Sequence, residues 1–170
     1  MSIVVESEVG LSEKPIIFTA WSIARIQAGL KTQARRVSGA YTPGELRWVK
    51  EALLSVADVT IYAADHRPVD NPNRGWRWKG RVLPAMFMPR WASRLLLEVT
   101  GVREERLREI TPADALAEGC ESVQDFALLW DRLNARRGYP WASTPLVRVV
   151  GFLRGPVEPR RQVAAESSNI

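Results

Sequence analysis

The sequence predicts an α+β fold built on a curled antiparallel sheet. Short apolar runs typical of buried strands recur along the chain, and two stretches carry helix-capping residues followed by apolar residues at helical spacing. The 170 residues are enough for one ordinary domain. The expected order is a strand, a helix, further strands, a helix pair and a last strand, which is typical of an α+β domain.

The first half of the chain predicts one helix among several strands. Residues 15–18 form an apolar run expected to be a buried strand, and Thr19 follows as a capping residue of a helix that Gly29 ends. Further extended segments are expected over 30–37, 46–52 and 59–64, with a turn at 42–44. Residues 65–80 mix Pro, Gly, Asn and Arg and predict a long loop, a kind of segment that often carries function.

The second half predicts two strands, two helices and a closing strand. The strands are expected over 81–88 and 94–102. Thr111, followed by Pro112 and an acidic residue, is a helix start, and the helix is expected to stop at Gly119. Ser122 repeats the capping pattern before a second helix, and residues 146–153 predict the last strand. We expect an N-terminal arm over 1–13, a domain over 14–154 and a flexible C-terminal tail over 155–170.

The composition excludes several classes of site. Cys120 and His66 stand alone as the only cysteine and the only histidine, so the chain cannot form an internal disulfide or a Cys/His zinc site. His66 lies in a loop-like segment, which is more typical of a solvated histidine than of a catalytic base. We expect no metal and no cofactor. A lone thiol, the lack of a long apolar run and an acidic N-terminus predict a cytoplasmic protein without a membrane span.

Positive charge is concentrated in one segment of this basic protein. Residues 67–94 contain seven cations and one acidic residue, Asp70, which gives that segment a charge of +6 against +5 for the whole chain. A local excess of this kind favours a polyanionic partner such as RNA. Tryptophan and arginine alternate within it, and such a pattern supplies stacking faces and phosphate contacts. The candidate residues are Trp76, Arg77, Trp78, Arg81, Arg90 and Arg94.

The same tryptophans have a structural interpretation. They can close the ends of a small barrel, with the arginines covering them. For Trp76 and Trp78 the sequence favours neither interpretation, whereas Trp91 is expected to belong to the core. Three further tryptophans are expected in the core, namely Trp48, Trp130 and Trp141.

A second candidate site follows the first predicted helix. Lys31 and Arg35 share one face of an extended segment, and Thr32 and Arg36 share the other. Two cations on one face suit a phosphate or an acidic partner. The alternative is an exposed basic strand whose cations pair with glutamates.

Glu118 is a candidate acid or base at the end of its predicted helix. The helix dipole disfavours an anion in the last turn, which tends to raise the pKa of the carboxyl group and suits general acid or base chemistry. The alternative is an ordinary exposed glutamate.

These motifs, taken in order, resemble the ASCH domain family, whose members have a PUA-like β-barrel with flanking helices. The likeness covers about residues 14–153 and is nearest to the version carried by bacteriophages and prophages. The matching stretches are Gly29–Arg35, Thr42–Glu51, Met88–Arg94, Ile110–Gly119 and Leu129–Asn134. The resemblance implies a barrel in which Lys31, Glu118 and part of 76–94 surround one cleft.

The resemblance also implies a set of functions. ASCH domains are generally regarded as RNA-binding modules, some small members are amidohydrolases acting on N4-acetylcytidine, and others are described as ribonucleases. The amidohydrolases use a lysine, a threonine and a glutamate. Carried over, the lysine is Lys31 and the glutamate is Glu118, but the threonine position is Ala34, with Thr32 two residues earlier. The catalytic set is therefore incomplete.

Three hypotheses follow. The first is a phage- or prophage-derived protein of a bacterial host that binds RNA or a nucleotide-like ligand, using Lys31, Thr32, Arg35 and the basic segment. The second is a hydrolase on the same cleft, a ribonuclease or an amidohydrolase of modified pyrimidines, with Lys31 as base or nucleophile and Glu118 as acid or base. The third is a phage accessory or morphogenesis protein that binds another protein through its tryptophans and arginines.

Overall fold

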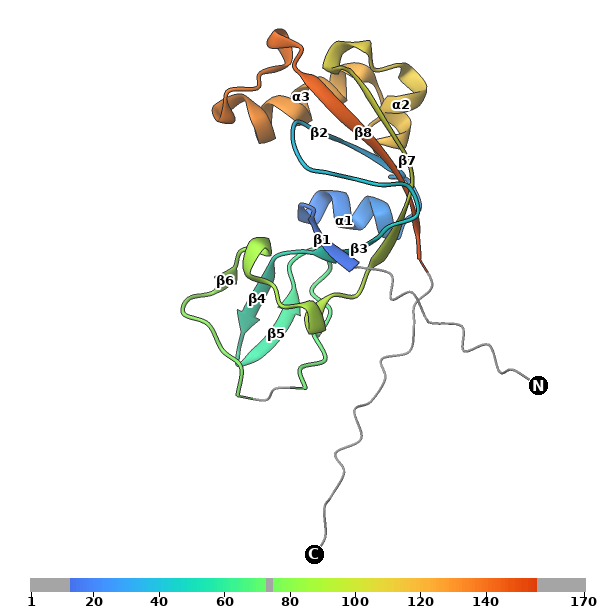
Figure 1. The fold of residues 1–170 in the computed structure, drawn as a ribbon. Helices are drawn as coiled ribbons and strands as arrows, with labels where there is room; N and C mark the ends of the chain where they lie inside the picture. The colour runs from blue at the N-terminus through green and yellow to red at the C-terminus, as the bar shows by residue number, and fades with distance from the viewer. Residues whose placement is uncertain (1–12, 73–74, 156–170) are drawn as a thin grey trace, which may run out of the picture.

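The structure, a computed structural model, describes residues 13–72 and 75–155 (Figure 1). The predicted arm, apart from Glu13, and the predicted tail, apart from Gly155, lie outside the described residues. The strands are β1 (Glu13–Ile17), β2 (Gln33–Arg36), β3 (Leu46–Lys50), β4 (Leu53–Val56), β5 (Val59–Tyr62), β6 (Val82–Leu83), β7 (Leu96–Arg106) and β8 (Leu146–Arg154). The helices are α1 (Ala20–Gln27), α2 (Pro112–Ala117) and α3 (Val123–Asn134). Short 3-10 helices are η1 (Ala85–Phe87), η2 (Arg90–Ala92), η3 (Leu107–Glu109), η4 (Ala135–Arg137) and η5 (Trp141–Ser143).

Two sheets organise the chain and confirm the predicted α+β class. The larger sheet has the order β1-β3-β7-β8-β2, with one parallel pair, β1 and β3, and antiparallel pairs elsewhere. The smaller sheet has the order β5-β4-β6 and is antiparallel. Within the described residues the larger sheet ends at β1 and β2, so the sheets do not close into the barrel that the resemblance implies. Because β2 is an edge strand, one side of it is open to a pocket.

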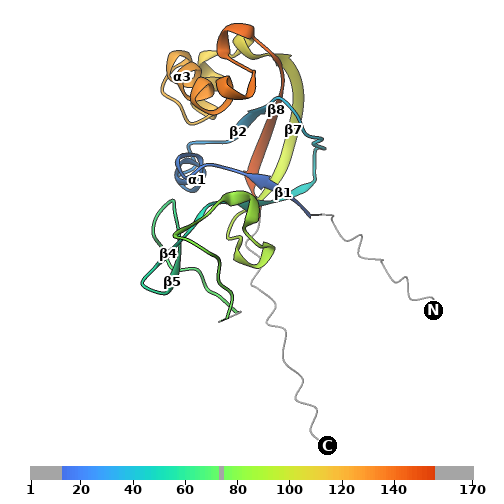
Figure 2. The same ribbon diagram turned by 90° about the vertical axis from the view of Figure 1, so that its left-hand side faces the viewer.

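The long strands β7 and β8 connect the two ends of the molecule. They run side by side from the helices α2 and α3 to the lobe formed by the smaller sheet (Figure 2). Their register shifts between Val99 and Gly101, and Gly151 lies opposite this irregularity. A Cβ atom on Gly151 would meet the Thr100 hydroxyl at 2.9 Å, so a larger residue there would require the Thr100 side chain to move. The predicted strand over 94–102 therefore exists but runs on to Arg106.

The predicted helix boundaries are confirmed. The Thr19 side chain accepts from the Ser22 N–H, and the Ser122 side chain accepts from the Asp125 N–H. Thr111 and Asp114 form a reciprocal capping box at the start of α2. Gly29 and Gly119 follow α1 and α2 with φ of 74° and 88°, the left-handed region that glycine adopts freely.

In the smaller lobe one predicted strand is much shorter than expected, and one strand was missed. Residues 81–88 form a strand only at Val82–Leu83, because Pro84 has no N–H to continue the ladder and the chain turns into η1. The strand β4 was not predicted at all. It joins β5 through a turn in which Ala57 and Asp58 have φ of 47° and 64°, a turn that usually carries Asn-Gly or Asp-Gly.

The core divides into three clusters. One packs α1 against the larger sheet around Ile23 and Val49, and a second lies beneath α2 and α3 around Phe126 and Trp130. The third fills the smaller lobe around Leu53. Trp130 is buried as predicted. Trp91 and Trp141 are half-buried and pack against the core clusters, and Trp48 is half-buried. No helix among residues 13–72 and 75–155 is long and apolar enough to cross a membrane.

Candidate functional site

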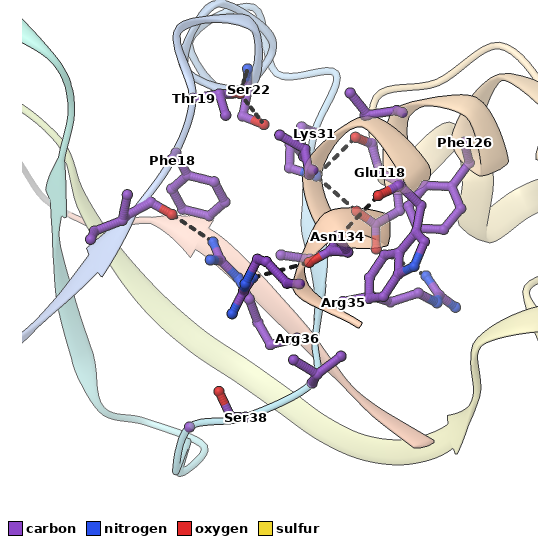
Figure 3. A pocket seen from close by; sticks show the side chains of 18 of the residues that line it. Phe18, Thr19, Ser22, Lys31, Arg35, Arg36, Ser38, Glu118, Phe126 and Asn134 are labelled. Carbon is purple, nitrogen blue, oxygen red and sulfur yellow. Dashed lines mark hydrogen bonds and ion pairs between the residues drawn. The ribbon is translucent and has the colours of Figure 1, made fainter. Parts of the chain in front are cut away.

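A pocket of about 440 Å³ opens at the free edge of β2. One wall comes from the end of β1 and the first turn of α1, and the opposite wall comes from α3 and η4. Strand β2 and the loop that follows it form the side between them (Figure 3). The volume lies in the range of about 300–1,000 Å³ that is typical of small-ligand sites.

The floor of the pocket holds a buried ion triad. The Lys31 Nζ donates to Glu118 Oε2 at 2.8 Å and to the Glu118 carbonyl oxygen at 2.9 Å. The Arg35 Nη1 donates to Glu118 Oε1 at 3.0 Å. Glu118 is 2% exposed, and Lys31 and Arg35 are each 6% exposed. The predicted shared face of Lys31 and Arg35 is therefore confirmed, and the glutamate that pairs with them is Glu118 rather than a surface residue.

Behind the triad, Arg35 contacts two more carboxylates. Its Nη2 donates to Glu105 Oε1 at 2.5 Å and to Asp114 Oδ2 at 3.2 Å. Arg103 bonds the same two acids from the outside, at 3.2 Å and 3.0 Å. We call this group the ion cluster; its members are the buried Lys31, Arg35 and Glu118, the half-buried Glu105 and Asp114, and the exposed Arg103. Three cations meet three carboxylates, so the cluster is neutral without a ligand.

The end of α2 explains why Lys31 and Glu118 meet. Glu118 is the C-cap residue of α2, and Lys31 forms an isolated antiparallel bridge with it. The Thr32 N–H donates to the Ala117 carbonyl at 2.8 Å, which ties the start of β2 to the helix end. A Cβ on Gly119 would meet the Arg25 Cδ at 2.8 Å, so glycine permits this close packing as well as the positive φ.

The capping role of Asp114 has an electrostatic consequence. Burial raises the pKa of its carboxyl group, but hydrogen bonds from the Thr111 backbone, Gln33, Arg103 and the Thr111 side chain outweigh burial and lower the pKa to about 2. A carboxyl group whose folded-state pKa lies below its unfolded value stabilises the fold above the unfolded pKa. This stabilisation is lost as the pH falls toward 2.

The Asp114→Asn variant tests this consequence. At neutral pH we expect it to be less stable than the wild type by about 2 kcal/mol, the equivalent of the shift from 3.8 to about 2. The difference should shrink as the pH falls from about 5 to about 2, because both proteins then carry a neutral group. Urea denaturation of the two proteins across this range measures it. A difference that stays constant with pH would show that the charge of Asp114 is not involved.

Aromatic rings line the walls above the triad. Phe126 and Trp130 from α3 lie with ring centroids 6.1 Å apart, and the Arg35 guanidinium lies 5.8 Å from the centre of the Phe126 ring. Phe18 faces them from the end of β1 (Figure 3). The pocket therefore combines a charged floor with apolar walls, an arrangement that suits a flat heteroaromatic ligand. From the sequence, Trp130 was expected in the core, and neither Phe126 nor Trp130 was expected to line a site.

Some predicted site residues lie away from this pocket. Thr32 is exposed and does not line it, and none of the described residues in 76–94 does so either. The tryptophans Trp76, Trp78 and Trp91 pack on one another in the smaller lobe, with centroids 5.1 Å apart in both adjacent pairs. The expected single cleft containing part of 76–94 is not found, because β4–β6 and their loops form a separate lobe with its own core.

Acidic residues of this chain pair with some of the cations of the smaller lobe. Arg77 and Arg81 are exposed. Arg90 bonds Glu13 Oε2 at 2.8 and 2.6 Å. Arg94 forms a bidentate pair with Glu51, at 2.9 and 2.7 Å, and also bonds Asp65 at 2.7 Å. The charge counted along the sequence is therefore partly neutralised by acids outside the counted segment.

The described residues include no group of three or more His, Cys, Asp and Glu side chains that could hold a metal ion. His66 is exposed, as expected for a solvated loop histidine. Cys120 is buried beneath α3, and burial raises the pKa of its thiol. A buried thiol with a raised pKa is a poor nucleophile.

Comparisons with known proteins give two similar folds. No protein-family model and no curated protein matches the sequence. The chain is similar to the crystal structure of an ASCH domain from Lactobacillus crispatus JV V101, with 13% identity and a TM-score of 0.48 over 84% of this chain and 79% of that one. It is also similar to protein EF3133 of the DUF984 family from Enterococcus faecalis V583, with 10% identity and a TM-score of 0.45 over 83% and 80%. Both are likenesses of fold at low sequence identity.

Proposed function

We propose that this protein binds a nucleobase-containing ligand, RNA or a nucleotide, in the pocket beside β2. One observation carries the proposal: a buried donor and a buried acceptor, Lys31 and Glu118, lie side by side on the floor beneath aromatic walls. The resemblance of the sequence to phage-type ASCH domains, which are regarded as RNA-binding, supports the same choice.

The triad keeps hydrogen-bonding capacity for a ligand. Lys31 has three N–H donors and uses two of them on Glu118. Among the described residues, Oε2 of Glu118 accepts a hydrogen bond from Lys31 alone. The pair therefore offers a donor next to an acceptor. Nucleobases present the complementary edge, an acceptor beside an N–H donor, and their flat faces suit the rings of Phe126 and Trp130. Such an edge fixes the orientation of a base in the pocket.

The smaller lobe extends this proposal to longer RNA. Arg77 and Arg81 are exposed beside the half-buried Trp76 and Trp78, and they would contact phosphates outside the pocket. Arg90 and Arg94 each pair with a carboxylate of this chain, which reduces the positive charge that they offer to a phosphate.

Hydrolysis by Lys31 and Glu118 is the alternative function of the same pocket. Ala34 lines the pocket and is buried, so the position implied for a catalytic threonine carries a methyl group. Binding without turnover is therefore the function that this pocket supports best. Ribonuclease or amidohydrolase activity would appear as cleaved or deacetylated product when RNA or N4-acetylcytidine is incubated with the protein. A protein partner bound by the smaller lobe would be recovered independently of nuclease treatment.

The Lys31→Met variant tests the proposal. We expect it to bind labelled single-stranded RNA at least about tenfold more weakly than the wild type, because a hydrogen bond to a charged group is lost in a buried site. Fluorescence anisotropy at about 50 and about 200 mM salt measures affinity and its salt dependence. The matched control is Lys14→Met, which removes a half-exposed lysine outside the pocket and should bind like the wild type.

One outcome would contradict the pocket as the binding site. If Lys31→Met binds RNA like the wild type, while replacing Arg77 and Arg81 with glutamate abolishes binding, the smaller lobe carries the interaction. A circular dichroism spectrum and a thermal melt of each variant exclude loss of folding as the cause.

A further inference from the structure

Two arginines at the mouth of the pocket are not part of the ion cluster. Arg36 is the last residue of β2, and Arg137 is the last residue of η4 on the wall formed by α3. Both line the pocket, Arg36 from the β2 side and Arg137 beside Asn134 (Figure 3).

Neutral groups hold both guanidinium groups in place. The Arg36 Nη2 donates to the Ile17 carbonyl at 2.7 Å, and its guanidinium lies 4.9 Å from the centre of the Phe18 ring. The Arg137 Nη1 donates to Asn134 Oδ1 at 3.1 Å, and the buried Asn134 in turn donates to the Trp130 carbonyl at 3.2 Å. An arginine has five N–H donors, so most donors of both side chains remain available.

Within the part of the chain that the structure describes, no ion pair balances the positive charge of this pair. Among the residues that the structure describes, no carboxylate lies within ion-pair distance of Arg36 or Arg137. Of the described residues that line the pocket, Glu118 is the only acid, and it is bound by Lys31 and Arg35. Burial lowers the pKa of the Arg36 guanidinium; Tyr41 and Glu118 act in the opposite direction, and the charge of Arg137 lowers it further. The mouth of the pocket thus carries two like charges close enough to act on each other.

We propose that Arg36 and Arg137 form a subsite for a terminal phosphate group, so that the ligand of this pocket is a nucleoside monophosphate or the phosphorylated end of an RNA strand. This inference rests on the proposed function. A phosphomonoester carries a charge of about −1.5 to −2 near neutral pH, which matches two arginines better than the single charge of an internal phosphodiester. Guanidinium groups bind phosphate oxygens through paired N–H donors.

The geometry places the two ends of such a ligand at the two ends of the pocket. The base would meet the donor–acceptor pair on the floor, where the charges already cancel. The phosphate would lie between the arginines at the mouth, where they do not. A cavity of about 440 Å³ suits one nucleotide rather than several stacked ones.

Isothermal titration calorimetry with the four ribonucleosides, their 5′-monophosphates and inorganic phosphate tests the subsite. We expect at least one monophosphate to bind about tenfold or more tightly than its own nucleoside. Arg137→Ala should remove this gain and leave the affinity for the nucleoside unchanged within about twofold. Arg36→Gln should act in the same way, with retention of part of the side chain that covers Phe18. The matched control is Arg136→Ala, which removes an exposed arginine one residue away that does not line the pocket.

Further measurements distinguish a free nucleotide from the phosphorylated end of an RNA strand, and they test the phosphate subsite separately from the proposed function. RNA oligonucleotides with and without a 5′-phosphate show whether a strand end is bound in the same way, and a preference abolished by Arg137→Ala supports it. Equal affinity for a nucleoside and its monophosphate, with both weakened by Lys31→Met, would overturn the subsite and leave the proposed function standing. A gain that survives both arginine variants would also overturn it. If none of the probes binds, including RNA, the proposed function fails and the subsite fails with it.

Discussion

Replacing Glu118 with alanine is expected to lower the free energy of unfolding by about 3–5 kcal/mol. The carboxylate is 2% exposed and holds two buried cations, Lys31 Nζ at 2.8 Å and Arg35 Nη1 at 3.0 Å. Without this carboxylate, Lys31 keeps its hydrogen bond to the carbonyl of residue 118. Arg35 loses the acceptor of its Nη1 group. Breaking a buried pair on one side costs far more than the intact pair contributes, because the remaining charge has lost its water.

Denaturation by urea measures this loss, and two further variants assign its cause. Glu121→Ala removes an exposed glutamate three residues away and should change stability by less than about 0.5 kcal/mol. The double variant Lys31→Met with Glu118→Ala removes one of the orphaned cations and should recover part of the loss. A cost below about 1 kcal/mol for Glu118→Ala alone would mean that water reaches the triad and that the floor of the pocket is not a desolvated site.

Local signals were sufficient to predict the elements that carry the triad. The capping residues Thr19, Thr111 and Ser122 and the glycines after α1 and α2 fixed the helix ends, because these effects depend on a few neighbouring residues. The alternation of an extended segment likewise put Lys31 and Arg35 on one face. The pairing of Lys31 with Glu118, 87 residues away, was available only through the family resemblance.

The rest of the cluster depends on tertiary register. Glu105 reaches Arg35 because β7 runs past Gly101 and pairs with β8, and no local pattern indicates where that strand ends. The arginines at the mouth of the pocket are likewise brought together by tertiary packing. Arg137 lies beyond α3 and comes to the same pocket as Arg36 only because α3, η4 and β2 line that pocket in the folded chain. Hydrophobic periodicity and capping residues are local patterns, so they do not predict which residues from distant elements share a site.

The charge of residues 67–94 could not be judged from that segment of the sequence alone. The excess of cations there is real along the chain, but the acids that neutralise Arg90 and Arg94 lie outside the segment, at Glu13, Glu51 and Asp65. The electrostatic potential depends on the distances between charges in space. A count of charges along one segment therefore overestimates the potential when acidic partners come from other segments. Arg77 and Arg81 remain exposed, and the basic surface of the smaller lobe is therefore narrower than the sequence predicts.

Replacing Arg94 with leucine is expected to destabilise the protein by about 3–5 kcal/mol at neutral pH. Its guanidinium holds both oxygens of Glu51, a side chain with no exposed surface, at 2.9 and 2.7 Å. Burial raises the pKa of Glu51 above its ordinary value even though Arg94 opposes the shift. Without Arg94 the Glu51 carboxylate would be charged, buried and unpaired, and burying an unpaired charge lowers the free energy of unfolding.

The pH dependence of Arg94→Leu identifies Glu51 as the cause. A carboxyl group whose folded-state pKa is raised binds its proton more tightly in the folded protein, so stability increases as the pH falls through the folded pKa. The deficit of the variant should therefore shrink from neutral pH toward the unfolded pKa near 4.5. The matched control is Arg90→Leu, which breaks a partly exposed pair with Glu13 and should cost less than about 1 kcal/mol. RNA affinity of the folded Arg94→Leu protein should stay near that of the wild type. A variant as stable as the wild type that no longer binds RNA would show instead that Arg94 serves the ligand.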